Sequence, residues 1–149
     1  MIHGSSGSVE KQVGDLKAYP GVRKILTATH DALENPYGQS VAHIAKGLVE
    51  KEGYTQVVSA SSGFGKDVMP RLGGLLDLQA ITDVVKIEDG GAKFVRPIYA
   101  GNAMCTVSTS DAVKLLTVRG TNFEKVKPGD GDSGAATEAV DGVEDIVSA

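Results

Sequence analysis

The sequence predicts an α/β fold: a three-layer α/β/α domain with a mainly parallel sheet and an antiparallel β-rich extension. The parallel part is predicted from two strand-like apolar runs, at residues 22–29 and 55–60, and from the segments of helical period that alternate with them. The extension is predicted because strand-like segments follow one another from residue 83 to residue 118 without helices between them. The 149 residues are enough for one domain with a buried core.

The first helix is predicted from Val9, Val13 and Leu16, which recur at helical spacing. Ser8 stands before them and belongs to a residue type that caps helices. The Pro-Gly pair at 20–21 ends the run. We therefore expect a short helix with one buried face.

Residues 22–29 form the first predicted strand, because their apolar run is typical of a buried parallel strand. A second helix begins at Gly38 and ends at Gly53. Its predicted buried face repeats at intervals of three and four and consists of Val41, Ile44, Ala45, Leu48 and Val49.

Residues 55–60 form the next predicted strand, and a Ser/Gly-rich turn through Gly65 opens a third helix. This order of strand, helix, strand and helix predicts parallel strands with right-handed crossovers. The predicted buried side of the third helix consists of Val68, Leu72, Leu75 and Leu76.

The extension begins with a predicted hairpin. Residues 83–88 and 93–98 flank the sequence Asp-Gly-Gly-Ala at 89–92, which favours a tight turn between two strands. Residues 102–108 and 113–118 add two more predicted strands. We therefore expect the domain to end in a β-rich, partly antiparallel section.

The last part of the chain differs in composition from the rest. From Glu124 onward, seven acidic residues stand against two lysines, whereas the preceding body is close to neutral. Residues 125–136 are rich in Gly and Asp and nearly free of large apolar side chains, a composition typical of linkers. We therefore expect a domain at residues 1–123 and an acidic linker at residues 124–149.

Composition also excludes several classes of function. The body has no basic stripe of the kind that neutralises phosphates, so we expect no nucleic-acid partner. No apolar run approaches the roughly 20 residues of a membrane helix, so we expect no direct membrane insertion. Cys105 is the only cysteine, which excludes an intrachain disulfide and a zinc site built from several thiolates.

The segment Ser62-Gly63-Phe64-Gly65-Lys66 is the strongest candidate for ligand binding. It stands at a predicted strand-to-helix turn, where backbone N–H groups and the helix dipole favour an anion. Its spacing is neither that of a Walker A loop nor GxGxxG. A structural loop is the favoured interpretation, and a freestanding adenine-nucleotide-binding α/β module is the alternative.

A hydrolase is a second alternative, since His30 and Asp31 lie at the end of one predicted strand and Ser59, Ser61 and Ser62 lie at the end of another. The nucleophile-elbow pattern GxSxG is absent from the sequence. The three histidines are far apart in the sequence, and nothing indicates that they converge on a metal. We therefore predict no catalytic, cofactor-binding or metal-ligating residue in this chain.

Three blocks carry a resemblance to a known family, and they occur in order along the chain. They are Ser62 to Leu72 (SGFGKDVMPRL), Ile81 to Val84 (ITDV) leading into Phe94 to Ala103 (FVRPIYAGNA), and CTV at 105–107 followed by TVRGTNF at 117–123. With these blocks, the sequence from Ile2 to Phe123 resembles the N-terminal domain of the electron transfer flavoprotein alpha subunit.

The resemblance implies an electron-carrier subunit rather than an enzyme. Such carriers pair an alpha with a beta subunit, take electrons onto FAD from acyl-CoA dehydrogenases and related enzymes of fatty acid β-oxidation, and pass them to a membrane-bound quinone oxidoreductase. In the family a second domain of the alpha subunit holds the FAD. The resemblance thus implies that the chain is a fragment of a longer protein and binds no FAD itself.

Two segments of the third block, CTV at 105–107 and TVRGT at 117–121, look closer to the mitochondrial members of the family than to the bacterial ones. The resemblance therefore implies the mitochondrial matrix, with the cytoplasm as the location if the source is bacterial. As a domain without the flavin, the chain would act as a scaffold that packs on the beta subunit and supports the FAD domain.

Four residues of the β-rich part are predicted to have interface or structural roles: Arg96, Tyr99, Asn102 and Arg119. In the structural interpretation, Asn102 satisfies backbone groups at a bend while the two arginines pair with carboxylates such as Asp83 or Glu88. In the interface interpretation, the four fix the packing against the beta subunit and the FAD domain. The two interpretations are compatible.

Overall fold

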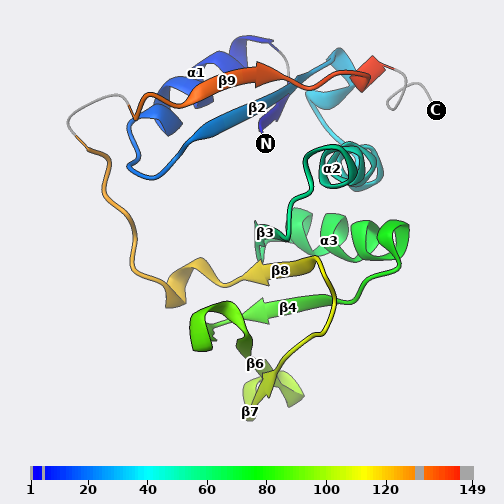
Figure 1. Ribbon diagram of the computed structural model, residues 1–149, viewed down its shortest axis with the longest axis vertical. Coiled ribbons are helices and arrows are strands. Elements are labelled where there is room, and N and C mark those ends of the chain that lie inside the picture. The colour runs from blue at the N-terminus through cyan, green and yellow to red at the C-terminus, as the bar shows by residue number, and fades with distance from the viewer. Residues whose placement is uncertain (1, 5, 130–132, 145–149) are drawn as a thin grey trace. The chain divides into compact units, whose positions relative to one another are not determined.

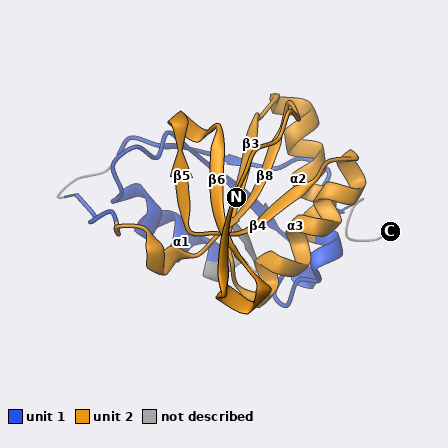
Figure 2. Ribbon diagram, turned by 90° about the horizontal axis from the view of Figure 1, so that it is seen from below, with its two compact units in different colours: residues 1–40, 126–149 blue, residues 41–125 orange. Residues whose placement is uncertain are grey.

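The computed structural model describes residues 2–4, 6–129 and 133–144, which form an α/β structure of helices and strands (Figure 1). The chain divides into two compact units (Figure 2). The first unit takes residues 1–40 and 126–149, and the second takes residues 41–125. The predicted α/β class, with parallel and antiparallel sheets, is confirmed.

The first unit contains a parallel sheet in the order β1-β2-β9. Its strands are β1 (Ile2–Gly4), β2 (Lys24–Thr29) and β9 (Ala136–Ala139). Helix α1 (Ser6–Lys17) connects β1 to β2, and because it begins at Ser6, Ser8 lies within the helix and is not the predicted cap. A short 3-10 helix, η1 (Asp31–Leu33), follows β2.

Strand β9 lies in a segment that composition indicates to be a linker. Its four residues are all exposed, and it is held by backbone pairing to β2, with Leu26 opposite Glu138. Beside it, Val9, Ile25 and Ala135 form a small buried cluster. A strand without apolar alternation gives no periodic signal, which is why the sequence did not predict β9.

The second unit contains two further helices and six strands. They are α2 (Gly38–Glu52, whose first residues belong to the first unit), β3 (Gln56–Ala60), α3 (Gly63–Leu76), β4 (Ala80–Val84), β5 (Lys86–Glu88), β6 (Lys93–Ile98), β7 (Ala103–Val107) and β8 (Lys114–Val118).

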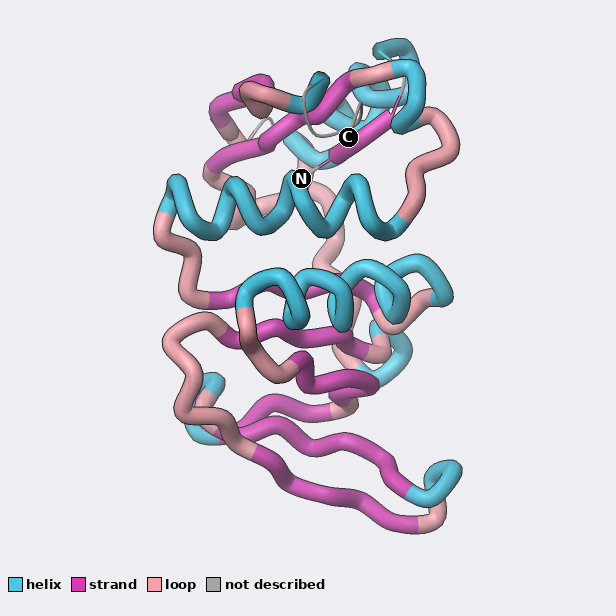
Figure 3. Tube along the Cα trace, turned by 90° about the vertical axis from the view of Figure 1, so that its right-hand side faces the viewer, coloured by secondary structure: helices cyan, strands magenta, loops and turns pink. Residues whose placement is uncertain are grey.

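The core of the second unit lies on both faces of a parallel sheet in the order β3-β8-β4. Because side chains alternate along a strand, Leu115 and Leu116 of β8 point to opposite faces. Leu115 packs with Met69 and Leu72 of α3, whereas Leu116 packs with Phe94 of β6. Figure 3 shows the corresponding layers, with helices on one side of the parallel strands and antiparallel strands on the other.

The position of β8 differs from the prediction that placed residues 113–118 in the partly antiparallel section. The strand pairs in parallel with both β3 and β4 and is the middle strand of their sheet. Its residues Leu115, Leu116 and Thr117 are at most 1% exposed. A buried run of this kind is typical of a parallel strand, but the local sequence does not say which strands it pairs with.

The predicted strand at residues 83–88 is in fact two strands. The register of β4 against β8 shifts between Ile81 and Val84, and Asp83 adopts a left-handed backbone with φ of 60°. After this irregularity, the backbone N–H of Val85 bonds to Val95, and the chain continues as β5 in the antiparallel sheet β5-β6-β7. The break therefore transfers the chain from one sheet to the other.

The two hairpin turns of the antiparallel sheet have the same backbone form. In the first, Asp89, Gly90 and Gly91 have φ values of 50°, 63° and 92°. In the second, the corresponding values are 50°, 54° and 92°, and the residues are Tyr99, Ala100 and Gly101. Each turn closes with a backbone hydrogen bond, of 3.2 Å in the first and 3.1 Å in the second.

Candidate functional site

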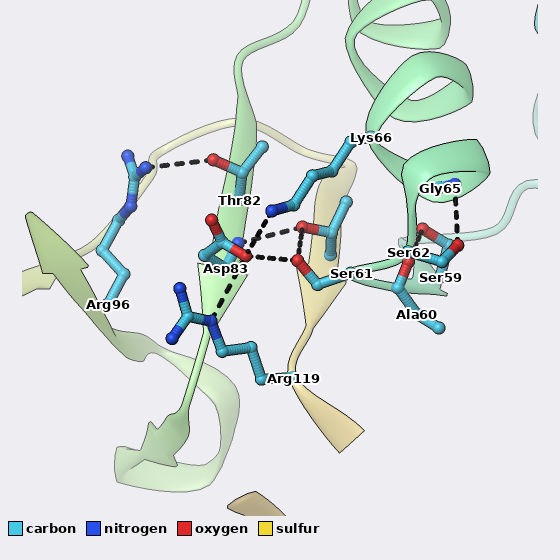
Figure 4. Close-up of polar contacts among 11 residues, drawn as sticks. Ser59, Ala60, Ser61, Ser62, Gly65, Lys66, Thr82, Asp83, Arg96 and Arg119 are labelled. Carbon is cyan, nitrogen blue, oxygen red and sulfur yellow. Dashed lines mark hydrogen bonds and ion pairs between the residues drawn. The ribbon is translucent and has the colours of Figure 1, made fainter. Parts of the chain in front are cut away.

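The polar residues that converge most closely lie at the carboxyl ends of the parallel strands (Figure 4). Ser61 follows β3, Asp83 lies near the end of β4, and Arg119 follows β8. Lys66 lies in the first turn of α3. In open α/β sheets this end of the strands is where ligands bind, so the cluster is the candidate site.

The start of α3 is fixed by its own sequence. The side chain of Ser62 caps the helix by accepting a hydrogen bond of 3.1 Å from the N–H of Gly65. Gly65 packs so closely on the end of β3 that a Cβ atom there would lie 2.0 Å from the carbonyl oxygen of Ala60. The glycine is therefore required for this helix to begin beside the strand.

The Asp83 carboxylate is the centre of the site. Its Oδ1 atom accepts a short hydrogen bond from the hydroxyl of Ser61 and lies 3.1 Å from Nζ of Lys66 and 3.4 Å from Nε of Arg119. The hydrogen bond from Ser61, followed by the effects of Lys66 and Arg119, lowers the pKa of Asp83 against the opposing effect of burial. Asp83 is therefore a carboxylate at neutral pH.

The backbone of Asp83 is held as firmly as its side chain. Its N–H donates to Oγ1 of Thr117 at 2.9 Å, and the Thr117 hydroxyl donates to Oγ of Ser61 over a longer 3.5 Å. Because the Ser61 hydroxyl donates in turn to Asp83, the three residues form a closed ring of hydrogen bonds. Thr117 is fully buried, so the ring is anchored in the sheet.

Of the four residues predicted for interface or structural roles, Arg119 belongs to this site. It forms the predicted ion pair with Asp83. Arg96 lies beside the site, where its Nη2 donates to Oγ1 of Thr82 at 3.0 Å. Among the described residues no carboxylate pairs with Arg96, and its buried Nε has no acceptor. The predicted pairing of Arg96 with Asp83 or Glu88 is therefore wrong.

Tyr99 and Asn102 lie in the second hairpin turn rather than in the site. The backbone N–H of Asn102 donates to the carbonyl oxygen of Tyr99, and the Tyr99 side chain is 79% exposed. The structure places Asn102 at the predicted bend, but among the described residues its side chain has no hydrogen bond, so the prediction that it satisfies backbone groups there is not confirmed. The structure therefore separates the four predicted residues into an arginine at the site, one beside it and two in a turn.

Sequence reasoning missed Asp83 and Thr117 as central residues. A possible signal was the polar pair Thr82-Asp83 between apolar residues at a strand end, the usual position of functional residues in such sheets. The serines of the hydrolase alternative have other roles, since Ser61 bonds to Asp83 and Ser62 caps α3. His30 also acts as a cap, with Nδ1 accepting from the N–H of Ala32.

The described part of the chain shows no group of metal ligands and no membrane-spanning helix. Within it, no three His, Cys, Asp or Glu side chains are grouped closely enough to hold a metal ion. Over the same residues, no helix has the length and apolar character needed to cross a membrane.

A family model and the curated relatives that match this chain point to the same family. The family described as "Electron transfer flavoprotein domain" has a sequence model that matches residues 2–146. The chain is 34% identical over 135 residues to a protein named "Probable electron transfer flavoprotein subunit alpha, mitochondrial" from Cryptococcus neoformans var. grubii, covering 89% of the chain and 39% of that protein.

A plant relative is more similar over a shorter stretch. The "Electron transfer flavoprotein subunit alpha, mitochondrial" of Oryza sativa subsp. indica is 38% identical over 107 residues, covering 71% of the chain and 30% of that protein. The chain thus spans 30% to 39% of the length of these two curated relatives.

Proposed function

Because the chain belongs to the electron transfer flavoprotein family, we propose that it is a structural domain of an alpha subunit and binds the beta subunit through its antiparallel sheet. In this proposal the chain is part of an electron carrier and has no catalytic residues of its own. The observation that carries it is the pair of hairpin turns with one backbone form and two different sequences.

The first turn has residues suited to its backbone, and the second does not. Asp, Asn and Gly tolerate a left-handed backbone, and the first turn reads Asp89-Gly90-Gly91. The second places Tyr99 and Ala100 at similar positive φ values, of 50° and 54°, although neither residue type tolerates this conformation well. An aromatic residue in a strained turn does not stabilise the chain itself, so its presence there supports a role in binding a partner.

The exposed apolar side chains of the same sheet support this role. Tyr99 is 79% exposed, and Met104, which follows the same turn, is 57% exposed. Tyrosine and methionine are enriched at protein interfaces, where they lose contact with water. Arg96 of β6 adds a guanidinium whose only hydrogen bond among the described residues is to Thr82. We therefore propose Arg96, Tyr99 and Asn102 as residues of the beta-subunit interface.

Arg119 has a structural role in this proposal, because it pairs with Asp83 across the ends of two strands. It keeps the loop after β8 against β4, where its backbone N–H also donates to the carbonyl oxygen of Val84 at 2.8 Å. The linker towards the FAD domain that was predicted at residues 124–149 is retained here as a proposal, although residues 136–139 of it form β9.

The described residues do not fit the FAD of the family. A flavin dinucleotide carries a pyrophosphate, and the start of α3 is the position in this fold that favours such an anion. Asp83 brings a negative charge to that position, with Oδ1 taking the donors of Ser61, Lys66 and Arg119. We therefore propose that FAD is bound by a part of the alpha subunit that this chain, which spans 39% of the first fungal relative, does not include.

The wider role follows from the family. We propose that the intact protein accepts electrons from acyl-CoA dehydrogenases and related enzymes and delivers them to a membrane quinone oxidoreductase during fatty acid β-oxidation. The names of the fungal and plant relatives place those proteins in mitochondria, which supports the mitochondrial matrix as the location of this one.

The test is co-purification of this chain with an electron transfer flavoprotein beta subunit. The informative variant carries Y99D and A100G together, which gives the second turn a sequence like that of the first. The control is Y37D, because Tyr37 is also exposed, at 80%, but lies outside the antiparallel sheet. We expect the turn variant to lose at least about tenfold in affinity while Y37D binds like the unmodified chain.

Two outcomes would contradict the proposal. One is retention of the beta subunit by the turn variant at the level of the Y37D control. The other is flavin absorbance at stoichiometric amounts in this chain purified alone, which would support the nucleotide-binding alternative instead. Reconstitution with a full-length alpha subunit, in which we expect flavin absorbance, serves as the positive control.

A further inference from the structure

We propose that Asp83 is a built-in anion that occupies a phosphate position at the end of the parallel sheet and thereby excludes phosphate-bearing ligands. This goes beyond the scaffold role, since it assigns Asp83 as a residue that determines what this domain does not bind. It also predicts a binding site that a single substitution would open.

The donors around Asp83 are those that proteins use for phosphate. Ser61 offers a hydroxyl, Lys66 an ammonium group at 3.1 Å and Arg119 a guanidinium Nε–H at 3.4 Å. All three converge on one oxygen atom, Oδ1, as they would on a phosphate oxygen (Figure 4). One carboxylate therefore satisfies two cations and a hydroxyl.

The backbones that carry these donors are fixed without the carboxylate. The N–H of Ser61 donates to the carbonyl oxygen of Val118 at 2.7 Å, and the N–H of Lys66 donates to that of Ser62 at 2.9 Å. The N–H of Arg119 donates to the carbonyl oxygen of Val84 at 2.8 Å. Removal of the Asp83 side chain therefore leaves three donors anchored at one end of the sheet.

The position of the carboxylate is a feature of the fold rather than one rotamer of a free side chain. Asp83 has a left-handed backbone and stands where the register between β4 and β8 shifts. Its N–H is held by the buried hydroxyl of Thr117. The Asp83 side chain is 21% exposed, and those of Lys66 and Arg119 are 47% and 46% exposed. A solute that replaced the carboxylate would reach both cations from solvent.

The experiment compares two aspartates of the same backbone type. D83G removes the carboxylate of the site, and D77G removes that of Asp77, which also has a left-handed backbone but is exposed at the end of α3 and has no ion pair with a described residue. Both variants change the net charge equally and place glycine where a positive φ favours it. The probe is inorganic phosphate, titrated against chloride at constant ionic strength.

We expect D83G to bind phosphate roughly tenfold more tightly than D77G or the unmodified chain, because two cations and a hydroxyl lose their internal partner. Calorimetry and the phosphate-dependent shift in melting temperature measure this difference. Adding K66Q and R119Q to D83G should lower the affinity for phosphate to that of D77G. The same titration with AMP tests whether the opened position accepts a nucleotide phosphate.

If D83G does not fold, D83N and D77N replace the pair, since asparagine tolerates the backbone and keeps an acceptor for Ser61 while removing the charge. The proposal is overturned if a folded Asp83 variant binds phosphate no better than its Asp77 counterpart. It is also overturned if the unmodified chain already binds phosphate as tightly, or if K66Q and R119Q leave the gained affinity unchanged. None of these results bears on beta-subunit binding, which is measured separately.

Discussion

The backbone N–H of Asp83 donates to the buried hydroxyl of Thr117 at 2.9 Å, so the middle strand β8 fixes the left-handed residue of β4. This contact joins two strands at the point where their regular register fails. Without it, the N–H would lie next to the sheet without a partner. The hydroxyl therefore supports both the sheet and the carboxylate site above it.

Replacing Thr117 by valine should destabilise the chain. T117V keeps the shape of the side chain but leaves the Asp83 N–H unpaired, a loss of about 1–3 kcal/mol in the free energy of unfolding. Urea unfolding measures it, with T106V on the exposed face of β7 as the control. A T117V chain as stable as T106V would show that the hydrogen bond contributes nothing.

The stability that Asp83 contributes should depend on pH with a definite sign. Its pKa in the folded chain lies below the ordinary 3.8, chiefly because of Ser61 and then of Lys66 and Arg119. As the pH falls, the unfolded chain therefore takes up the proton first, and the contribution is lost between about pH 5 and the folded pKa. Above this range the contribution is fully present.

The measurement compares urea unfolding of the unmodified chain and D83N from pH 7 to pH 3. We expect D83N to be about 1–3 kcal/mol less stable at pH 7, and this gap to narrow as the pH falls below 4. D77N is the control, and its free energy of unfolding should differ little from that of the unmodified chain at any pH. A gap of constant size across the range would mean that the charge of Asp83 is not what stabilises the chain.

The close packing of Gly65 predicts a large effect of one added methyl group. In G65A the Cβ atom would lie 2.0 Å from the carbonyl oxygen of Ala60, so either α3 or the end of β3 must move. We expect a loss of about 3 kcal/mol or more in the free energy of unfolding. Thermal or urea unfolding followed by circular dichroism measures it.

The matched control for G65A is G74A in the same helix. A Cβ at Gly74 would meet no atom within 4 Å, so alanine should leave the stability unchanged or raise it by about 0.5–1 kcal/mol. If both variants lost the same stability, the contact with the carbonyl oxygen of Ala60 would not be the cause of the loss in G65A.

The two hairpin turns predict opposite effects of exchanging their residues. Y99D with A100G relieves two left-handed residues that carry an unfavourable Cβ, and we expect the isolated chain to gain about 1 kcal/mol. The reciprocal change, D89Y with G90A, should lose a similar amount. Melting temperatures of both variants test this, and a turn variant that gained no stability would remove the argument for a strained second turn.

Helices and most strands could be predicted from the sequence because their signals are local. The period of Val68 and Leu72 predicted the buried side of α3, and both are buried there. The turn at 89–92 was predicted from the sequence Asp-Gly-Gly-Ala and from the strand-like segments on either side of it. Such features depend on neighbours a few residues away, which a sequence displays directly.

The placement of β8 and the site around Asp83 could not be predicted in this way. Whether residues 114–118 pair in parallel depends on β3 and β4, which lie far away in the sequence. The site forms only because that pairing brings Arg119 and Thr117 to Asp83 and Ser61. Neither the partners nor the left-handed backbone of Asp83 has a local signature.

The central position of β8 has a consequence for synthesis of the chain on the ribosome. β3 and β4 are made first but cannot pair with their shared neighbour until residue 118 has emerged. Until then both nascent strands expose unpaired edges, and α3 and β6 expose the apolar side chains that Leu115 and Leu116 later cover. Because β8 is the last of the three strands to be made, a pause in translation before residue 114 prolongs the interval in which a chaperone must protect the chain.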